Sequence, residues 1–320
     1  MTKYKIILLI ALIPLLAFGQ AKVGTAEGQF LEIGVSARGM AMAEAFTGTA
    51  DDASAIFFNP SGVGRLTRRE FMFTHIEYLA GINYEIGAFV MPIAATGGVA
   101  GLSVNSLNTG DMYETTPSHP EGTGRTFNAH CLATGLTYSQ MLTDRFSAGL
   151  TWKYIHEQYA DVGASTWAVD LGTMYRTEFK NLRIGMSIRN FGPDITFISD
   201  PAPLPMAFHL GFAGEVIDNE MHKLTLALET SHPNDNLEKF NFGTEYWWDD
   251  MVAIRAGVKA KPDSIASFAK LPAIDMHLIY YSFGAGVKIP VYLYTIKVDY
   301  AFTDRYWFKP EHRFTIGMEF

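Results

Sequence analysis

The feature that most constrains the fold is an alternation of apolar and polar residues with a period of two, which recurs along most of the chain. In residues 146–154, for example, Leu150 and Trp152 lie on one face of an extended chain, whereas Thr151 and Lys153 lie on the other. This period is that of a half-buried β-strand. A strand of a soluble sandwich shows the same pattern, so the alternation predicts strands without fixing how they are arranged. The expected strands are residues 69–79, 82–91, 99–107, 126–138, 146–154, 165–176, 182–189, 207–216, 222–230, 239–247, 252–259, 278–288, 292–302 and 313–320, of which the first alternates poorly.

The connections between these segments alternate in length, which favours a membrane barrel over a soluble sandwich. The short connections are residues 141–144, 177–181, 217–221, 248–250 and 288–291. The longer, polar connections are residues 108–125, 157–163, 192–205, 231–237, 262–276 and 303–311. Outer-membrane barrels have tight periplasmic turns and longer external loops. We therefore expect residues 69–320 to form an all-β protein, a closed antiparallel transmembrane β-barrel of about 14 strands with both barrel ends on the periplasmic side.

The last expected strand ends on the final residue of the chain. Its apolar face consists of Phe314, Ile316, Met318 and Phe320. A terminal amphipathic strand that ends on phenylalanine resembles the signal that bacterial barrel assembly machinery reads. A closed barrel also satisfies the backbone hydrogen bonds that lipid cannot, so we expect outer-membrane lipid as a partner. Amphipathic rings suit the lipid–water boundary, and the expected girdle residues are Trp152, Trp167, Trp247, Trp248, Tyr292 and Tyr294.

The N-terminus has the pattern of an export signal. Lys3 and Lys5 precede an uncharged apolar stretch at residues 6–18, and small residues then allow cleavage between Gly19 and Gln20. A retained anchor helix is the alternative, but the apolar run is shorter than the roughly 20 residues that a spanning helix needs. We therefore expect residues 1–19 to be a cleaved signal peptide of an outer-membrane protein.

Composition and motifs argue against several function classes. The net charge of −8 disfavours nucleic acid, which needs a basic surface. Cys131 is the only cysteine, which rules out an internal disulfide or a thiolate metal cluster. The sequence has no nucleophile-elbow, zinc-protease, P-loop or Rossmann motif. We expect a non-enzymatic protein without a cofactor or metal; a barrel enzyme with residues from several strands is the alternative.

The polar faces of the expected strands carry charges of both signs, which would point into the barrel lumen. They are Lys153, Asp170, Arg183, Arg189, Glu215, Lys223, Glu229, Glu245, Arg255, Lys259, Lys297, Asp299, Arg313 and Glu319. An ion-selective pore tends to show one sign at its constriction. The mixture favours paired charges that brace a filled or narrow lumen over a path for substrate.

Residues 20–68 do not alternate, and we expect them to form a hatch that enters the barrel from the periplasmic side. Asn59-Pro60-Ser61-Gly62 combines a turn-starting Asn, a Pro that fixes φ and a Gly that permits positive φ. We expect this motif to turn the hatch into the first strand, with gating of the lumen as the alternative. Asp51 and Asp52 could bind a cation, but the rest of a calcium loop is missing. Capping of the hatch or pairing with a luminal arginine is favoured.

The hatch resembles the start of the PorV/PorQ family of outer-membrane proteins, which are themselves similar to the FadL long-chain fatty-acid transporters. The matching segments are Gly24-Thr25-Ala26, Gln29-Phe30-Leu31, Ile33-Gly34-Val35, Ala37-Arg38-Gly39-Met40-Ala41-Met42, Ala50-Asp51-Asp52-Ala53-Ser54-Ala55 and Asn59-Pro60-Ser61-Gly62. The match covers about forty residues. It implies a FadL-like fourteen-stranded barrel with an N-terminal hatch.

The resemblance implies two functions. A PorV/PorQ-type protein of Bacteroidetes would assist type IX secretion or surface attachment of exported cargo, with secretion components or cargo as partners. A FadL-like protein would be a channel for uptake or export of long-chain hydrophobic molecules. This chain is shorter than the family members that move cargo, and its loops are modest. A purely structural outer-membrane protein is the third possibility.

Overall fold

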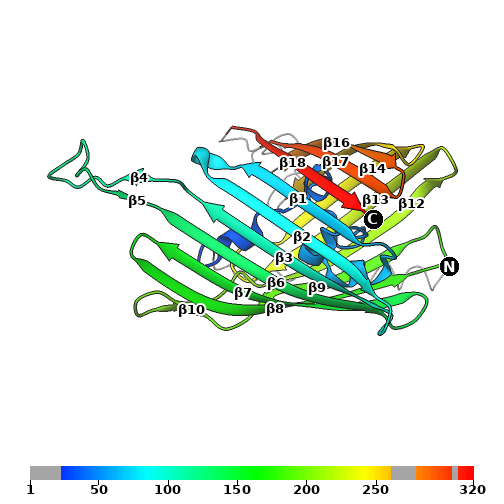
Figure 1. Ribbon diagram of the computed structural model, residues 1–320, viewed down its shortest axis with the longest axis horizontal. Helices are drawn as coiled ribbons and strands as arrows, with labels where there is room; N and C mark the ends of the chain where they lie inside the picture. The colour runs from blue at the N-terminus through cyan, green and yellow to red at the C-terminus, as the bar shows by residue number, and fades with distance from the viewer. Residues whose placement is uncertain (1–22, 261–278, 305–308) are drawn as a thin grey trace, which may run out of the picture.

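The computed structural model describes residues 23–260, 279–304 and 309–320, and in them fourteen strands form one closed antiparallel barrel (Figure 1). β1 pairs with both β2 and β18, which closes the sheet. The barrel strands are β1 (Glu70–Glu77), β2 (Asn83–Ile93), β3 (Gly98–Asn108), β6 (Ala129–Met141), β7 (Phe146–Tyr159), β8 (Val162–Arg176), β9 (Arg183–Phe191), β12 (Ala207–Asp218), β13 (His222–Pro233), β14 (Lys239–Trp248), β15 (Val252–Ala260), β16 (Ile279–Val291), β17 (Tyr294–Thr303) and β18 (Glu311–Glu319). Each corresponds to one expected strand, so the predicted architecture and strand number are confirmed.

Two of the expected connections are wrong. Residues 157–163 are not a polar loop, because β7 and β8 continue to a two-residue turn at Ala160-Asp161, where Ala160 has a φ of 51°. The last short turn lies at Tyr292-Leu293 rather than at 288–291, because β16 extends to Val291. The expected signal peptide and its cleavage point, the loop at 262–276 and the middle of the loop at 303–311 lie outside the described residues.

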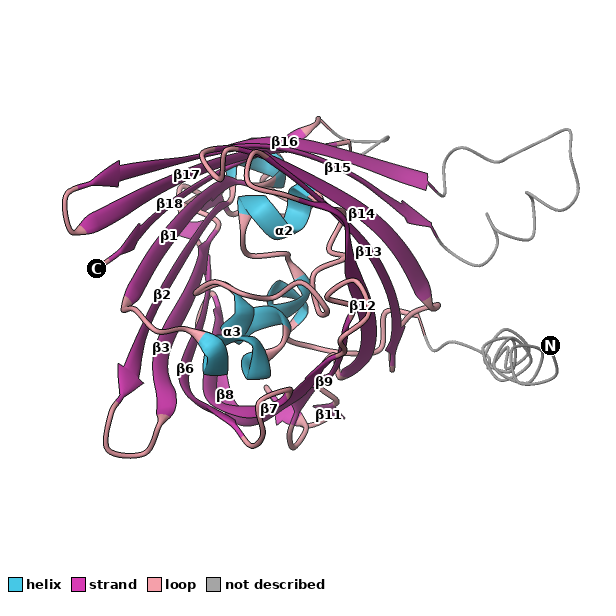
Figure 2. Ribbon diagram, turned by 90° about the vertical axis from the view of Figure 1, so that its right-hand side faces the viewer, coloured by secondary structure: helices cyan, strands magenta, loops and turns pink. Residues whose placement is uncertain are grey.

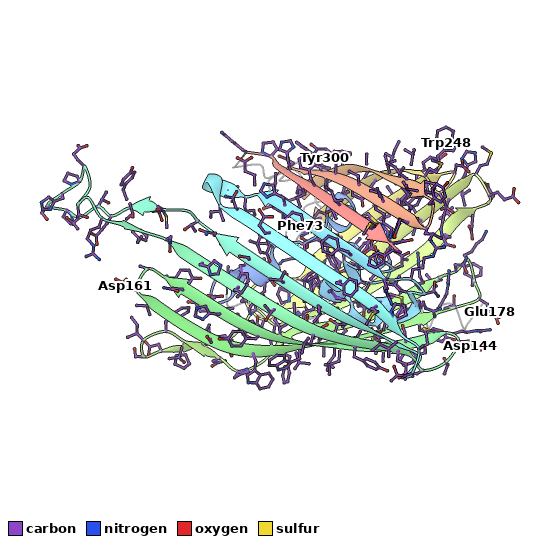
Figure 3. All side chains as sticks on the ribbon, viewed as in Figure 1. Phe73, Asp144, Asp161, Glu178, Trp248 and Tyr300 are labelled. Carbon is purple, nitrogen blue, oxygen red and sulfur yellow. The ribbon has the colours of Figure 1, made fainter. Side chains whose placement is uncertain are left out.

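The two ends of the barrel differ. At the end that we call the short-turn end, neighbouring strands are joined by residues 94–97, 142–145, 177–182, 219–221, 249–251 and 292–293. At the opposite, loop end, a hairpin that includes β4 (Met112–Tyr113) and β5 (Thr126–Phe127) projects beyond the wall (Figure 1), and β10 (Ile195–Thr196) pairs with β11 (Pro201–Ala202). Figure 3 shows Asp144 and Glu178 at the short-turn end and Asp161 at the loop end.

Alternate side chains of each strand point outward and inward, as the period of two requires. Phe73, Trp248 and Tyr300 point away from the barrel (Figure 3). Trp247 is an exception to the expected girdle, because it is 5% exposed and faces inward. Trp247 and Trp248 are adjacent, so only one of them can face outward. In β1 the burial alternates without a break, although Met72 and Ile76 face inward while His75 and Glu77 face outward. The chemical alternation is poor there because the inward side chains of β1 contact the hatch instead of water.

Residues 23–68 form the hatch, which lies inside the barrel except at its exposed ends and contains four short helices: η2 (Gln29–Glu32), α2 (Ala37–Ala41), α3 (Ala55–Phe58) and η3 (Pro60–Arg65). Ser36 caps α2 by accepting a hydrogen bond from the Gly39 amide, a common way to satisfy the free N–H groups of a helix start. Figure 2 shows α2 and α3 in different parts of the lumen, with α2 next to β15 and β16. None of the helices in the described residues has the length and apolar character to cross a membrane.

The hatch runs from the loop end to the short-turn end. The Gly24 amide donates to the Asp235 carbonyl at 3.2 Å, and the Glu27 amide donates to the Pro203 carbonyl at 3.0 Å; both acceptors lie in loop-end connections. Arg65 reaches the Asp144 carbonyl at the opposite end. The hatch was expected to enter at the end with the short turns, but its first described residues lie at the opposite end, where the loops hold them.

The inner wall has two chemically different sectors. Beyond Glu70, the inward positions of β1, β2, β3 and β6 carry no charged residue and are mostly apolar, with Thr74, Asn105 and Thr137 among the polar exceptions; we call this the apolar sector. Hatch residues pack on it, and Ile56, Phe58 and Val63 share one buried cluster with Ile76 and Ile86 of the wall. Each such side chain stabilises the fold by about 1.5–3 kcal/mol when fully buried. The other inward charged residues lie on the strands from β7 to β18. The hatch therefore contacts an uncharged wall on one side and a charged wall on the other.

Candidate functional site

The hatch backbone lies directly against the wall because seven inward positions, on seven strands, are glycine. These residues, which we call the glycine belt, are Gly149, Gly172, Gly185, Gly211, Gly243, Gly257 and Gly284. A β-carbon at Gly257 would lie 2.4 Å from the carbonyl carbon of Met42, and one at Gly185 would lie 2.3 Å from the Thr47 oxygen. Both distances are far inside van der Waals contact, so no other residue fits without moving the hatch.

The belt glycines also face one another across the strands. Three neighbouring pairs are in register: Gly149 with Gly172, Gly185 with Gly211, and Gly243 with Gly257. Paired glycines open shallow tracks of bare backbone on the inner wall. The hatch segments at residues 41–48 and 59–61 occupy these tracks.

Asn59-Pro60-Ser61-Gly62 begins the helix η3 instead of forming the expected turn into β1. Asn59 is the N-cap, with its side-chain oxygen accepting from the Ser61 amide at 3.2 Å and from the Ser61 hydroxyl at 2.7 Å. Pro60 occupies the first helical position, where its missing N–H is not needed. Gly62 does not have a positive φ. It is required because a β-carbon there would lie 2.3 Å from the Ala50 oxygen.

Asn59 also joins the hatch to the wall. Its Nδ2 donates to the Thr47 carbonyl at 3.0 Å and to the Thr173 carbonyl of β8 at 3.1 Å. Asn59 and Ser61 are both fully buried. The motif is thus a rigid connection between two hatch segments and β8, which fits a structural role better than a gating role.

Arg38 of α2 is the centre of a buried ion network near the short-turn end. Its Nη1 contacts Asp51 at 2.5 Å and Asp52 at 2.7 Å, and its Nε and Nη2 each bind Glu245 of β14 at 2.8 Å. Asp51 also lies 3.6 Å from Arg183 of β9. Both aspartates are therefore paired with Arg38 of the hatch, and Asp51 also lies near Arg183, a luminal arginine of the wall. Among the described residues, no group of three or more His, Cys, Asp or Glu side chains is placed to hold a metal ion.

Glu229 of β13 holds the middle of the hatch through its backbone. One carboxylate oxygen accepts from the amides of Phe46 and Thr47 at 2.9 and 2.8 Å. The other binds His209 at 2.9 Å, and Arg189 donates to the far side of the same ring. Charge-assisted bonds of this kind are about twice as strong as neutral ones.

The other predicted lumen charges lie at inward positions and are paired, across strands or with the hatch. Arg255 binds Glu245 and Asp299, both at 2.6 Å. The remaining pairs are Lys153–Asp170, Arg183–Glu215, Lys223–Glu215, Lys259–Glu44 and Arg313–Glu311, together with Lys297, which binds both Glu70 and Glu319.

The charges of the hatch are shifted by these partners. Burial alone would raise the pKa of Glu44, but the Lys259 ammonium at 2.5 Å, with Lys239 and Arg189, lowers it to about 2. Burial also opposes ionisation of Asp52, yet Arg38 and Lys297 lower the pKa of its carboxyl below the usual value. The carboxylates around Arg38 outweigh its burial and raise the pKa of its guanidinium. These hatch groups are therefore charged at neutral pH.

Small cavities remain beside the hatch in the described part of the chain, and two of them border the charged wall. One of about 30 Å³, enough for one or two waters, lies between Ile33, Phe57 and Lys153. A second, of about 130 Å³, lies at the short-turn end and is lined mainly by charged side chains, among them Arg38, Glu245, Arg255 and Lys288.

Several residues of the site were not predicted from the sequence. Arg38 and Glu44 lie in the hatch, where there is no strand period to show which way a side chain points. Glu157 was assigned to a loop edge but is fully buried inside the barrel. The glycine belt could have been found, because its members fall at inward positions of neighbouring barrel strands from β7 to β16, with only β13 lacking one.

The four C-terminal residues proposed as an assembly signal lie on the outer face of β18 and at its end. Phe314 and Ile316 are each 54% exposed, and Met318 is also exposed. Phe320 exchanges two backbone hydrogen bonds with Arg69, and its ring stacks on Phe89 at 6.3 Å. The end of the chain is thus fixed at the closing seam of the barrel.

Comparison with known proteins shows the fold and leaves the family open. No family model and no curated protein matches this sequence. The structure is similar to the Pseudomonas putida toluene transporter TodX, with a TM-score of 0.57, 12% identity and coverage of 89% of this chain and 97% of that one. It is also similar to the Ralstonia pickettii toluene transporter TbuX (TM-score 0.54, 12% identity, 87% and 97%) and to a Pseudomonas aeruginosa FadL homologue (TM-score 0.52, 10% identity, 89% and 98%). The specific resemblance to PorV/PorQ stays a prediction.

Proposed function

We propose that this protein is a non-enzymatic outer-membrane barrel that conveys hydrophobic molecules. The fold shared with two toluene transporters and a FadL homologue supports this function over a role in type IX secretion. The proposal includes the cleaved signal peptide, insertion by the barrel assembly machinery and contact of the outer face with lipid.

The observation that carries the proposal is the apolar sector of the lumen. A barrel with a water-filled channel has a polar interior, whereas Tyr84, Ile86 and Ile76 face inward here and are fully buried. They pack with Phe30, whose carbonyl accepts from the Tyr84 hydroxyl at 3.1 Å. An apolar molecule that replaced Phe30 in this sector would make the same apolar contacts. No charged group would have to lose its hydration for this exchange.

Uptake by cells tests the proposal. We would delete the gene in its own bacterium and measure entry of labelled toluene and of a labelled long-chain fatty acid, with glucose as the hydrophilic control. We expect entry of at least one hydrophobic probe to fall several-fold and glucose entry to stay unchanged, with recovery on complementation. Equal entry of both hydrophobic probes in the deletion strain would contradict the proposal.

A second candidate is assistance to type IX secretion or surface attachment. The hatch resemblance supports it, and so does the projecting hairpin, where Tyr113 is 79% exposed and could contact a partner protein. Under this function, deletion should leave exported cargo in the periplasm. Removal of residues 111–126 alone should have the same effect while the barrel still assembles. Normal secretion in a deletion strain without paralogues would exclude this candidate.

A further inference from the structure

Two cationic side chains at the cavity of the short-turn end do not form all the ion pairs and hydrogen bonds that they could. The cavity has a volume of about 130 Å³, and Trp247, Arg255 and Lys288, which border it, come from three adjacent strands. That volume exceeds what one water occupies. Carboxylates border the cavity too: Asp51, Asp52, Glu245, Asp299 and Glu319 are each paired with an arginine or lysine, and Asp250 lies on the turn after β14. The question is which chemical group the two cationic side chains would bind.

Lys288 has no anionic partner among the described residues, although it faces the lumen. Its Nζ lies 4.1 Å from the centre of the Trp247 ring. Its cross-strand neighbour is Lys297, and like charges directly opposite each other destabilise a sheet. Lys297 is neutralised by Glu70 and Glu319. Asp51 and Glu245 attract Lys288 only from beyond salt-bridge distance, so its direct contact is with the ring, which is weaker than an ion pair in a partly desolvated site.

Arg255 has one unused donor and borders the same cavity as Lys288. The side chain is fully buried; Nε binds Glu245 and Nη1 binds Asp299, but Nη2 has no hydrogen-bond partner in the described structure. Its Nη2 lies over Gly286, because a β-carbon there would be 3.0 Å away. Gly286 is the inward position immediately before Lys288 on β16, about 7 Å along the strand. The guanidinium carbon lies 5.2 Å from the centre of the same Trp247 ring.

We propose that this cavity binds an oxyanion, a carboxylate or phosphate group, with Lys288 and Arg255 as its ligands. An oxyanion would supply the ion pair that Lys288 lacks and accept from the unused guanidinium nitrogen. Arginine and lysine are the usual ligands of such groups. The inference goes beyond conveyance of hydrophobic molecules and does not depend on it. The anion can come free from solution or as the head group of an amphipathic molecule.

Calorimetric titration of the purified protein in a neutral, phosphate-free detergent solution tests the proposal. The probes are inorganic phosphate, acetate and octanoate at constant ionic strength, with chloride as the reference. We expect saturable binding of at least one oxyanion. Lys288→Met should weaken it about tenfold or more, the usual effect of losing a charge-assisted bond, and Lys288→Arg should restore it. Lys223→Met is the matched control, because Lys223 borders the same cavity but already pairs with Glu215; its effect should stay below threefold.

The probes also separate the two sources of the anion. Octanoate that binds more than tenfold tighter than acetate, with no competition from octanol, would identify the head group of an amphipath. Equal affinities, or a preference for phosphate, would identify a free anion. The absence of saturable binding, equal binding of chloride, or unchanged binding by Lys288→Met would overturn the proposal.

Discussion

Arg38 of the hatch and Glu245 of β14 form a two-bond ion pair, in which Nε and Nη2 each lie 2.8 Å from a different carboxylate oxygen. Glu245 is 3% exposed at its side chain, and Arg38 is 13% exposed. The planar guanidinium matches a carboxylate in this way, which lysine cannot do. The pair ties α2 to the wall at the level where Asp51 and Asp52 meet the same arginine.

Arg38→Met should loosen the hatch without unfolding the barrel. Three carboxylates would lose their shared cation, and breaking a buried pair typically costs about 3–5 kcal/mol. We expect a lower unfolding midpoint in detergent and faster proteolysis within residues 36–55. Arg145→Met is the control, because the Arg145–Glu178 pair is exposed and such pairs contribute little to stability. Equal effects of the two substitutions would show that the Arg38 network does not hold the hatch.

Gly257→Ala should destabilise the protein, because the new β-carbon would meet backbone atoms of Met42 and Ala43 at 2.4 and 2.5 Å. Overpacking of this kind typically costs about 1–3 kcal/mol. Gly214→Ala offers a matched comparison on β12, where the nearest atom is 3.7 Å away. We expect that variant to match the natural protein in thermal unfolding. If both variants have the same midpoint, the hatch is not seated against the wall as described.

Two substitutions at Asn59 separate its two roles. Asn59→Asp keeps the capping oxygen but loses the donors to Thr47 and Thr173, whereas Asn59→Ala loses both. Leaving buried carbonyls unpaired costs about 1–3 kcal/mol. We therefore expect the aspartate variant to lose most of the stability that the alanine variant loses. An aspartate variant as stable as the natural protein in urea would show that capping alone matters.

The Glu44–Lys259 pair should make stability depend on acid. The pKa of Glu44 is lowered to about 2 from an ordinary value of 4.5, so the pair stabilises the folded state above about pH 4.5. That contribution is lost as the pH falls from 4.5 towards 2. The unfolding midpoints of the natural protein and Glu44→Gln should therefore differ at pH 6 and converge near pH 2. A difference that stays constant over this range would contradict the low pKa.

Phe320→Ala should reduce assembly more than it reduces stability. Phe320 is the proposed end of the assembly signal, and its ring lies between Phe89 and Tyr294. We expect several-fold less protein in the outer-membrane fraction, measured by immunoblot with the chain intact. Phe283→Ala is the control, since Phe283 is an outward-facing aromatic on β16 outside the terminal strand. Equal losses would mean that lipid contact, not a terminal signal, is what the ring provides.

The sequence predicts the barrel well because strand period and hydrogen bonding are local properties. Leu150 and Lys153 reveal their faces from spacing alone, and every expected strand is present. Two of the errors, at β1 and at Trp247, arise where inward side chains contact protein instead of water. β1 alternates poorly in chemistry because Met72 and Ile76 face a hatch that packs apolar side chains on them. Trp247 was placed in the girdle because an aromatic residue near a strand end suits lipid, but its neighbours Arg255 and Lys288 are luminal.

The pairing of the lumen charges could not be predicted from spacing. Arg255 and Glu245 are cross-strand partners, which strand register alone would suggest. Arg38 comes from a segment without a period, and its contact with Glu245 spans 207 positions in the chain. Such contacts depend on how the hatch folds inside the barrel, and no local pattern encodes that path.

The seam of the barrel brings two acidic residues together, because Glu70 at the start of β1 is the cross-strand partner of Glu319 near the end of β18. Lys297 of β17 binds both. When the first and last strands meet, mutual repulsion of the two carboxylates would therefore oppose closure unless the penultimate strand is already in place. That lysine lies on the strand that pairs with β18, so the last hairpin of the chain brings the counter-charge of the seam with it.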